Sequence, residues 1–97
     1  MKRLISAICV LFFLLPLSAQ ETYQKETFIS SRGDTLQYRL LQPENMKKSE
    51  KYPLVLFLHG AGERGNDNER QLTHGGQMFL NPVNREKYPA FVLAPQC

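Results

Sequence analysis

Apolar residues follow two different patterns along the chain, and each pattern predicts a different kind of strand. Residues 27–31 and 35–41 are rich in β-branched, aromatic and leucine side chains, with a Ser-Arg-Gly-Asp turn signal at 31–34 between them. A glycine in that place can adopt the positive φ that a tight turn needs, so we expect a β-hairpin. Alternation gives the second strand two faces, one with Leu36, Tyr38 and Leu40 and the other with Gln37, Arg39 and Leu41.

The second pattern is an unbroken apolar run, and it occurs twice. Residues 53–58 and 90–94 are continuously apolar and are bounded by proline or glycine. A run without alternation suits a strand that is buried on both faces, as in a parallel sheet. We expect the second run to end at Pro95. The polar, lysine-rich residues 42–51 are typical of a surface loop.

The segment between the two apolar runs carries few helix signals. Asp67 or Asn68 can cap a short helix over residues 70–73, which the His-Gly-Gly sequence at 74–76 would stop. Residues 77–87 contain a proline and several charges, and we expect them to be irregular. Hairpin, buried strand, crossover and buried strand are the opening of an α/β fold. We expect that fold to be incomplete, because so few helical positions cannot cover both faces of two parallel strands.

The first twenty residues have the pattern of an export signal. Two basic residues at 2–3 precede an apolar stretch at 4–15, and a proline and two small residues follow it. The apolar stretch is shorter than the ~20 residues that a spanning helix needs. We therefore expect a signal peptide at 1–20 and a secreted or periplasmic domain at 21–97, with no membrane association after the signal is removed. An uncleaved membrane anchor is the alternative, and a lipoprotein anchor at Cys9 is less favoured.

Charge and cysteine content narrow the function further. The chain has 12 Lys+Arg and 9 Asp+Glu, but two of the basic residues belong to the export signal, so the remainder is nearly neutral. Its charges alternate in sign, which argues against nucleic-acid binding. Without the signal, Cys97 is the last and only cysteine, either a free thiol or half of a disulfide in a longer chain. No ligand spacing for zinc is present.

The candidate chemistry lies in the glycine-rich segment that follows the first apolar run. It reads His59-Gly60-Ala61-Gly62, followed by Glu-Arg-Gly at 63–65. Acyl transfer needs backbone N–H groups aimed at the oxygen that becomes negative, and a buried strand can hold such a donor in place. Glycines permit the sharp turn and let a substrate approach. We assign the donor N–H to Ala61, with Gly62 as the alternative, and a loop-shaping role to His59 and Gly60.

The same segment allows two other interpretations. Gly60, Gly62 and Gly65 satisfy the dinucleotide-binding pattern G-x-G-x-x-G. A polar run follows the third glycine, and Glu86, at about the right distance for the ribose-binding acid, lies in a polar segment rather than at a strand end. The second alternative is a glycine turn without a catalytic role, which would make the protein a secreted binding or surface-interaction module.

Neighbouring polar residues have simpler expected roles. Glu63 and Arg64 could contact the substrate, but a local salt bridge that braces the loop is favoured. His74 is expected to end a helix rather than to bind a ligand. The acidic and amide residues at 66–69 lack the spacing of a calcium loop, so capping is favoured over Ca²⁺ binding.

Residues 51–65, Lys-Tyr-Pro-Leu-Val-Leu-Phe-Leu-His-Gly-Ala-Gly-Glu-Arg-Gly, resemble the secreted predicted peptidase and esterase group of α/β-hydrolases. That group is related to polyhydroxybutyrate-depolymerase-like, feruloyl-esterase-like and phospholipase/carboxylesterase-like enzymes. The resemblance continues at residues 67–69, Leu72, 74–76 and 93–97. It implies an α/β-hydrolase fold, a Ser-Asp-His triad, ester or peptide substrates and no cofactor. It also implies that one oxyanion donor lies in the loop after this strand, and that the strand carrying the nucleophile lies beside residues 54–58.

The chain departs from that family in one respect. The G-x-S-x-G nucleophile turn is absent, and so are the triad acid and histidine that follow it in chain order. Ser30, Ser31 and Ser49 lack that context and are expected to be surface hydroxyls, and His59 precedes any nucleophile. We therefore expect the N-terminal fragment of a serine hydrolase, inactive as it stands, whose oligomeric state is left open.

The export signal generates the first testable prediction. We expect cleavage near Ala19 or Gln20, because the small residues and the polar run begin there. N-terminal sequencing of the protein recovered from outside the cytoplasm would check this. A recovered chain that still begins at Met1 would contradict it.

Overall fold

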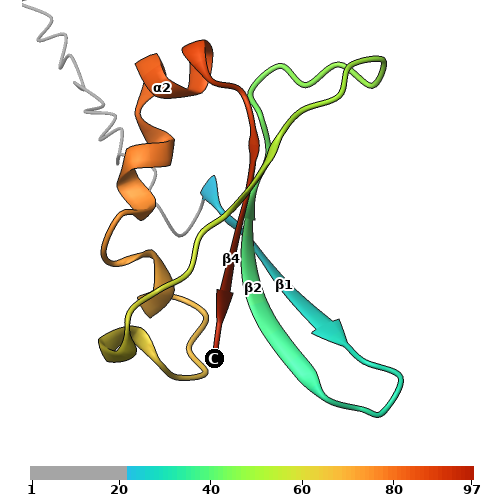
Figure 1. The fold of residues 1–97 in the computed structure, drawn as a ribbon, viewed down its shortest axis with the longest axis vertical. Coiled ribbons are helices and arrows are strands. Elements are labelled where there is room, and N and C mark those ends of the chain that lie inside the picture. Colours follow the sequence, from blue (N-terminus) through green and yellow to red (C-terminus); the bar gives the residue numbers. More distant parts are fainter. Residues whose placement is uncertain (1–21) are drawn as a thin grey trace, which may run out of the picture.

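The computed structural model describes residues 22–97, which form a four-stranded mixed sheet (Figure 1). An antiparallel hairpin of β1 (Gln24–Ile29) and β2 (Thr35–Leu41) precedes two parallel strands, β3 (Leu54–Leu56) and β4 (Phe91–Gln96). The strand order is β1-β2-β4-β3, so the last strand lies between the hairpin and β3. The first parallel strand is therefore at the edge of the sheet.

The predicted signal peptide at 1–20 lies outside the described residues, so its assignment stays a prediction. Within residues 22–97, the helices are all too short and too polar to span a bilayer. The predicted surface loop at 42–51 is irregular and mostly exposed, as its polar sequence indicated.

The predicted hairpin is confirmed, although its first strand begins at Gln24 rather than at residue 27. Gly33 has a φ of +87°, the left-handed conformation that a side chain would disfavour. The hydroxyl of Ser30 accepts hydrogen bonds from the N–H groups of Arg32 and Asp34, at 3.3 and 3.1 Å. These local bonds close the turn and bring Ile29 opposite Thr35.

Both predicted parallel strands are present, but their bounds differ from those expected. β3 contains only Leu54–Leu56, and beyond it the Phe57 N–H still donates to the Leu93 carbonyl at 2.9 Å. The prediction that the last strand ends at Pro95 was wrong. Pro95 has no N–H to donate to its register partner Tyr38. The Tyr38 carbonyl is nevertheless satisfied, because it accepts a hydrogen bond from the Asn68 side chain at 3.2 Å. Pairing with β2 therefore continues to Gln96.

The short helix predicted at 70–73 is a single 3-10 turn, η2 (Arg70–Leu72). Its N-cap position is Glu69 rather than Asp67 or Asn68, although Asp67 Oδ1 accepts from the N–H groups of Glu69 and Arg70 at 3.0 and 3.1 Å. Gly75, with a φ of +102°, ends this segment as expected. A single turn forms rather than a longer helix because the glycine follows so soon after the cap.

The prediction that residues 77–87 are irregular was wrong. They form most of a 3-10 helix, η3 (Gly76–Leu80), and all of α2 (Pro82–Lys87). The Asn81 side chain accepts hydrogen bonds from the N–H groups of Val83 and Asn84, at 3.0 and 3.3 Å. Proline suits the first position of a helix, where no N–H is needed, so Pro82 begins α2 rather than breaking it.

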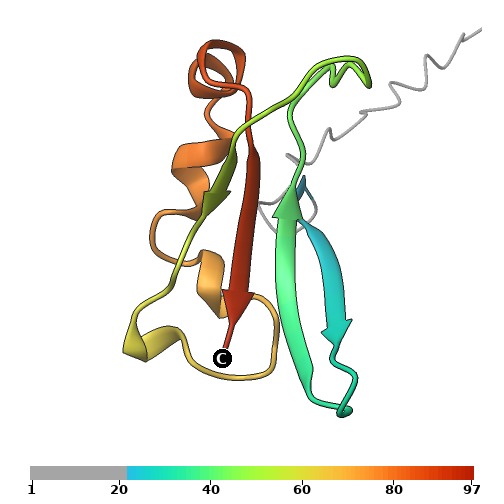
Figure 2. The ribbon, with the colours of Figure 1, turned by 45° about the vertical axis from the view of Figure 1, so that its right-hand side comes forward.

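The helical turns between β3 and β4 lie against one face of the sheet (Figures 1 and 2). The buried apolar residues on that side are Tyr23, Leu41, Leu72, Val92 and Ala94, with Val55, Phe57, Phe79 and Leu80 packed against them. The side chains of Gln37, Arg39 and Leu41 share this covered face, in agreement with the predicted alternation. Arg39 is only 1% exposed, and among the described residues it is the largest fully buried side chain.

The opposite face of the sheet is not covered within residues 22–97. Leu54, Leu56 and Leu58 are 63%, 57% and 68% exposed, and the register places the first two beside Phe91 and Leu93. The helical turns cover only the side of Val55, as expected for a chain with too few helical positions to cover both faces of its parallel strands. The outer edge of β3 also has no partner strand here. An exposed apolar edge is a template for association with another chain.

This exposed face generates a prediction for residues 21–97 expressed alone. We expect them to associate. Burying a large apolar side chain is worth about 1.5–3 kcal/mol, and several such side chains stay exposed here. Leu56→Lys should reduce the apparent mass in light scattering and the binding of a hydrophobic dye. Val83→Lys, at a position that is 67% exposed on α2, is the matched control and should change neither. A parent segment that is monomeric, with protected strand amides, would contradict the prediction.

Candidate active-site loop

The glycine-rich loop at 59–65 follows the carboxyl end of β3, next to the carboxyl end of β4 (Figures 1 and 2). Its first residue contacts the last residue of the chain, since the Cys97 N–H donates to His59 Nε2 at 3.2 Å. In open α/β sheets, ligands bind outside the carboxyl ends of the strands. The loop that the sequence singled out is therefore at the end of the sheet where a ligand is expected.

Two N–H groups of the loop are free to bind an oxygen from outside. Ala61–Glu63 form a 3-10 turn, η1, in which the Glu63 N–H donates to the Gly60 carbonyl at 3.2 Å. The first N–H groups of such a turn have no acceptor within it. Those of Ala61 and Gly62 make no hydrogen bond within residues 22–97, and both residues are exposed. They are the two residues that the sequence proposed as donors.

His59 makes a hydrogen bond through each ring nitrogen, one within the loop and one to Cys97, the residue after β4. Nε2 accepts from the Cys97 N–H, and Nδ1 lies 2.6 Å from the Gly60 carbonyl. A nitrogen that accepts carries no proton, so the proton of the neutral ring is on Nδ1 and is donated to Gly60. The predicted contact of His59 with the loop is present. The Cys97 thiol is free and exposed, 3.9 Å from Nε2.

The expected brace at Glu63 is present, but Arg64 takes no part in it. Glu63 instead pairs with His74, with 3.2 Å between Oε1 and Nε2, and its side chain is only 13% exposed. The chain is extended at Arg64, with φ −58° and ψ 148°, so the two adjacent side chains diverge. Arg64 makes no ion pair with any residue in 22–97. His74, expected only to end a helix, therefore also braces the loop.

Gly60 makes room for this arrangement. A Cβ on Gly60 would come within 3.0 Å of Glu63 Oε2, which is closer than ordinary contact. A side chain there would push the carboxylate away from His74. This is a packing reason for a glycine at position 60, in addition to the turn itself.

A buried amide of β4 supports the far end of the loop. Gln96 is 3% exposed, and its Nε2 donates to the Glu63 carbonyl at 3.0 Å and to Asp67 Oδ1 at 2.8 Å. Its Oε1 accepts from the Asn68 N–H at 2.6 Å. Sequence reasoning missed Gln96. The available signal was its alternation with Val92 and Ala94, which places a polar side chain on the covered face of an apolar strand.

Three further buried polar residues extend this network beneath the loop. Arg39 donates from Nε to the Asn68 carbonyl at 2.5 Å and from Nη1 to the Tyr23 carbonyl at 2.8 Å. Gln71 donates to Asn68 Oδ1 at 2.5 Å. Burial lowers the pKa of the Arg39 guanidinium, and the nearby Glu69 carboxylate opposes that shift. Asn68, held from several sides, has a φ of +54°, a conformation that asparagine tolerates better than most residues.

The geometry bears on two alternative binding roles of this segment. A dinucleotide fingerprint needs a helix to begin at its third glycine and to point its N-terminus at the pyrophosphate. After Gly65 the chain is irregular through residue 69 and then forms only η2, so this interpretation lacks its helix. In residues 22–97, no three His, Cys, Asp or Glu side chains are grouped to hold a metal ion. Asp67 instead accepts from the Arg70 N–H at the start of η2, and both Asp67 and Asn68 bind Gln96.

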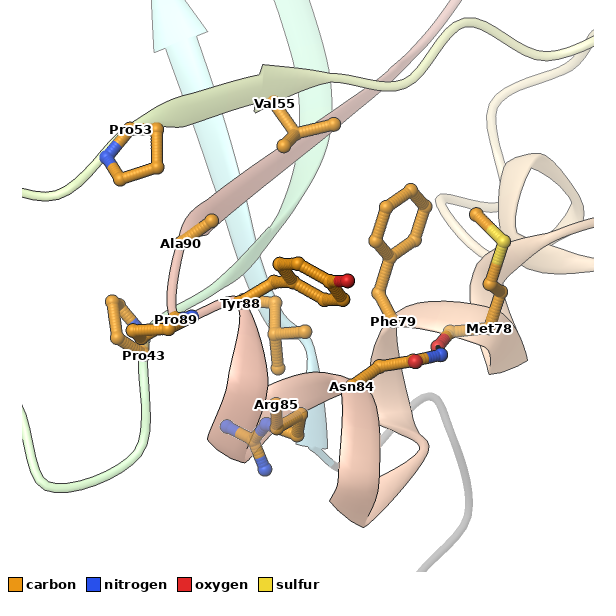
Figure 3. Close-up of a pocket in the computed structure, with 11 residues that line it drawn as sticks. Pro43, Pro53, Val55, Met78, Phe79, Asn84, Arg85, Tyr88, Pro89 and Ala90 are labelled. Carbon is orange, nitrogen blue, oxygen red and sulfur yellow. Dashed lines mark hydrogen bonds between the residues drawn. The ribbon is translucent and has the colours of Figure 1, made fainter.

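A cavity lies elsewhere in the described part of the chain (Figure 3). It has a volume of about 580 Å³ and is mostly apolar. Pro53 and Ala90, which precede the two parallel strands, line it together with Val55, Phe79 and Tyr88. The cavity is therefore at the amino end of these strands, and the glycine-rich loop takes no part in it.

The chain is similar to a thermostable esterase whose crystal structure is known. The two sequences are 42% identical, and the structures superpose with a TM-score of 0.73 over 79% of this chain. The match covers 21% of the esterase, so the chain spans about a fifth of that protein's length. No protein-family model and no curated protein matches the chain. The mixed sheet thus corresponds to part of an esterase fold, which supports an esterase-like α/β-hydrolase relationship.

The contacts of Asp67 generate a prediction for acid stability. The hydrogen bond from Gln96, followed by those from the N–H groups of Arg70 and Glu69, lowers the pKa of Asp67 from 3.8 to about 2. A carboxyl with a lowered folded-state pKa stabilises the fold above its unfolded pKa, and this contribution is lost as the pH falls. Between pH 5 and about 2, the denaturation midpoint of the parent should therefore fall more steeply than that of Asp67→Asn.

Asp34→Asn is the matched control, because it removes a carboxylate from the exposed hairpin turn. Its midpoint should follow the parent curve. If the Asp67→Asn and parent curves stayed parallel throughout this range, Asp67 would not be a source of acid sensitivity.

Proposed function

We propose that the complete protein is a serine hydrolase that cleaves ester or peptide bonds through an acyl-enzyme, and that this chain contributes the oxyanion-hole loop. The substrate is a small-molecule ester or a peptide, and the protein acts outside the cytoplasm after export. The Ala61 N–H is the donor on this loop, with the Gly62 N–H as the alternative. His59 and Gly60 shape the loop.

The observation that carries this proposal is the position of two free N–H groups in a chain that is 42% identical to part of an esterase. The N–H groups of Ala61 and Gly62 lie in a turn just beyond the carboxyl end of β3, and no acceptor within residues 22–97 occupies them. Donors fixed in advance stabilise the charge that develops on a carbonyl oxygen under attack. The sheet supplies that rigidity, since Phe57 is hydrogen-bonded to β4 two residues before the loop begins.

The loop can polarise a carbonyl but supplies no nucleophile. The serines within residues 22–97 are Ser30, whose hydroxyl closes the hairpin turn, and the exposed Ser31 and Ser49. In the proposed mechanism, a serine elsewhere in the complete protein attacks the carbonyl carbon. The carbonyl oxygen becomes negative and accepts a hydrogen bond from Ala61 until the leaving group departs. The unpaired edge of β3 is where we place the strand that leads to this serine.

A substitution that removes the proposed donor tests this function in the complete protein. Ala61→Pro deletes the N–H, and loss of one oxyanion donor typically lowers kcat by about 10²–10³. Ala61→Ser is the matched control, because it keeps the N–H at an exposed position and should keep kcat close to that of the parent. Hydrolysis of p-nitrophenyl acetate and of a chromogenic peptide, with thermal unfolding as the check on folding, would measure both.

Two results would count against the proposal. A folded Ala61→Pro protein with kcat within a few-fold of the parent would remove the donor assignment. A complete protein that turns over neither substrate, and that is not labelled by a serine-reactive fluorophosphonate, would remove the hydrolase assignment itself.

A further inference from the structure

The hydrogen bonds of Gln96 leave its side-chain amide only one orientation. Nε2 faces two acceptors, the Glu63 carbonyl and the Asp67 carboxylate, and Oε1 faces a donor, the Asn68 N–H. Rotating the amide by 180° would place oxygen against oxygen and N–H against N–H. At 3% exposure the group cannot replace a lost partner with water. Gln96 therefore makes three hydrogen bonds to residues 63–68, two as the donor and one as the acceptor.

These bonds connect a rigid strand to the turn that holds the free N–H groups. Glu63 is the last residue of η1, the turn that begins at Ala61, so a bond to its carbonyl fixes the carboxyl end of that turn. Gly65, with a φ of +149°, passes over the amide, where a Cβ would lie 3.5 Å from Nε2. His59 fixes the other end of the loop through the Cys97 N–H, one residue after Gln96. Both ends of the loop are thus held by the last two residues of the chain.

We propose that Gln96 is a positioning residue for the oxyanion-hole loop, because its amide holds the η1 turn at the distance from β4 that aims the Ala61 N–H. This rests on the proposed hydrolase function. Gln96 does not touch the substrate; it acts through the Glu63 carbonyl and the segment at 67–68. It requires an amide in particular, since no other side chain of this length donates to two acceptors while accepting from a backbone N–H.

Because an amide is required, replacing it by a carboxyl group should make kcat depend on pH in a way that loss of a purely structural residue would not. Gln96→Glu keeps the shape but turns the donor toward Asp67 into an acceptor 2.8 Å away. Two carboxylates so close cannot both ionise readily, so the pair retains a proton to a higher pH than either would alone. While that proton is present, the carboxyl group can donate one hydrogen bond. The titratable and charged groups connected to position 96 through contacts are Asp67, Glu63, Glu69, Arg70, His74 and Arg39, with His59 bonded to the adjacent Cys97.

The signature is measured in the complete protein as the ratio of variant to parent kcat for p-nitrophenyl acetate between pH 5 and pH 8. Gln96→Met, which neither donates nor accepts in this way, should lower kcat on the order of 10-fold at every pH with little change in KM. Gln96→Glu should match that loss at pH 8 and recover toward the parent as the pH falls. If Gln96→Met does not fold, Gln96→Asn, an amide one methylene shorter, replaces it with the same expected loss.

Gln37→Glu is the matched control. Gln37 is the register partner of Gln96 on β2 and shares its face of the sheet, but its side chain makes no hydrogen bond to the loop. It introduces the same charge one strand away and should leave the kcat ratio flat and near one. Folded Gln96 variants with kcat within two-fold of the parent at all pH values would overturn the proposal. So would a loss in Gln37→Glu equal to that in Gln96→Glu.

Amide hydrogen exchange separates this proposal from the proposed function. If the complete protein hydrolyses no ester or peptide, the function fails, and exchange at residues 60–68 still decides the role of Gln96. Faster exchange there in Gln96→Met than in the parent, with no change in Gln37→Glu, supports the positioning of the loop by Gln96. Unchanged exchange in Gln96→Met overturns it.

Discussion

A polar side chain buried between the sheet and the helical turns costs free energy unless it is hydrogen-bonded, and the bonds of Arg39 and Gln96 tie the glycine-rich loop to the sheet. Arg39 and Gln96 project from neighbouring strands into the covered face, where water is not available to satisfy them. Apart from the Tyr23 carbonyl, which accepts from Arg39, their partners are carbonyl, amide and carboxylate groups of residues 63–68, a mostly irregular segment. The loop is thus ordered by polar contacts with the strands rather than by helix or sheet bonds of its own.

The sheet topology separates the ends of the molecule into different environments. Because β3 and β4 are parallel, their carboxyl ends lie together, and the loop at 59–65 and Cys97 meet there (Figures 1 and 2). The amino ends lie beside the apolar cavity that Val55 and Phe79 line (Figure 3). At the second end Arg85, which lines the cavity, pairs with Glu44, whereas the free N–H groups and the contact of Glu63 with His74 lie at the first end. The carboxyl ends therefore suit the stabilisation of a developing negative charge, whereas the amino ends border an apolar cavity.

The partial coverage of the esterase and the exposed apolar face agree with each other. The match covers 21% of the esterase, and the part of the sheet seen here has one covered face and one bare edge. Leu54, Leu56 and Leu58 are apolar on the bare side as well as at the edge, the pattern of a strand made for burial on both faces. In the proposed hydrolase, the same edge that needs a partner strand is the one beside the oxyanion-hole loop. Completing the sheet and completing the active site are then one event.

The sequence by itself determined the elements whose signals are local. The turn at Gly33, the two unbroken apolar runs, the short turn after Asp67 and the place of the glycine-rich loop all depend on residues a few positions apart, so pattern and turn chemistry predicted them. The role of Pro82 as the first residue of a helix was also local, in the cap that Asn81 provides, but the proline was interpreted as a break. For the candidate site, the sequence singled out the loop and the residues proposed as donors, but not the contacts that hold the loop in place.

Only the tertiary structure decided which polar groups meet. Glu63 could pair with its neighbour Arg64 or with His74, and the direction of the chain after η1 selected His74. Gln96 contacts Asn68, 28 residues away in the sequence, and Arg39 contacts it from 29 residues away. Such partners cannot be predicted from spacing, because a hydrogen bond requires atoms to be within about 3 Å and correctly oriented. That proximity arises only once β4 inserts between β2 and β3 and brings the loop over its end.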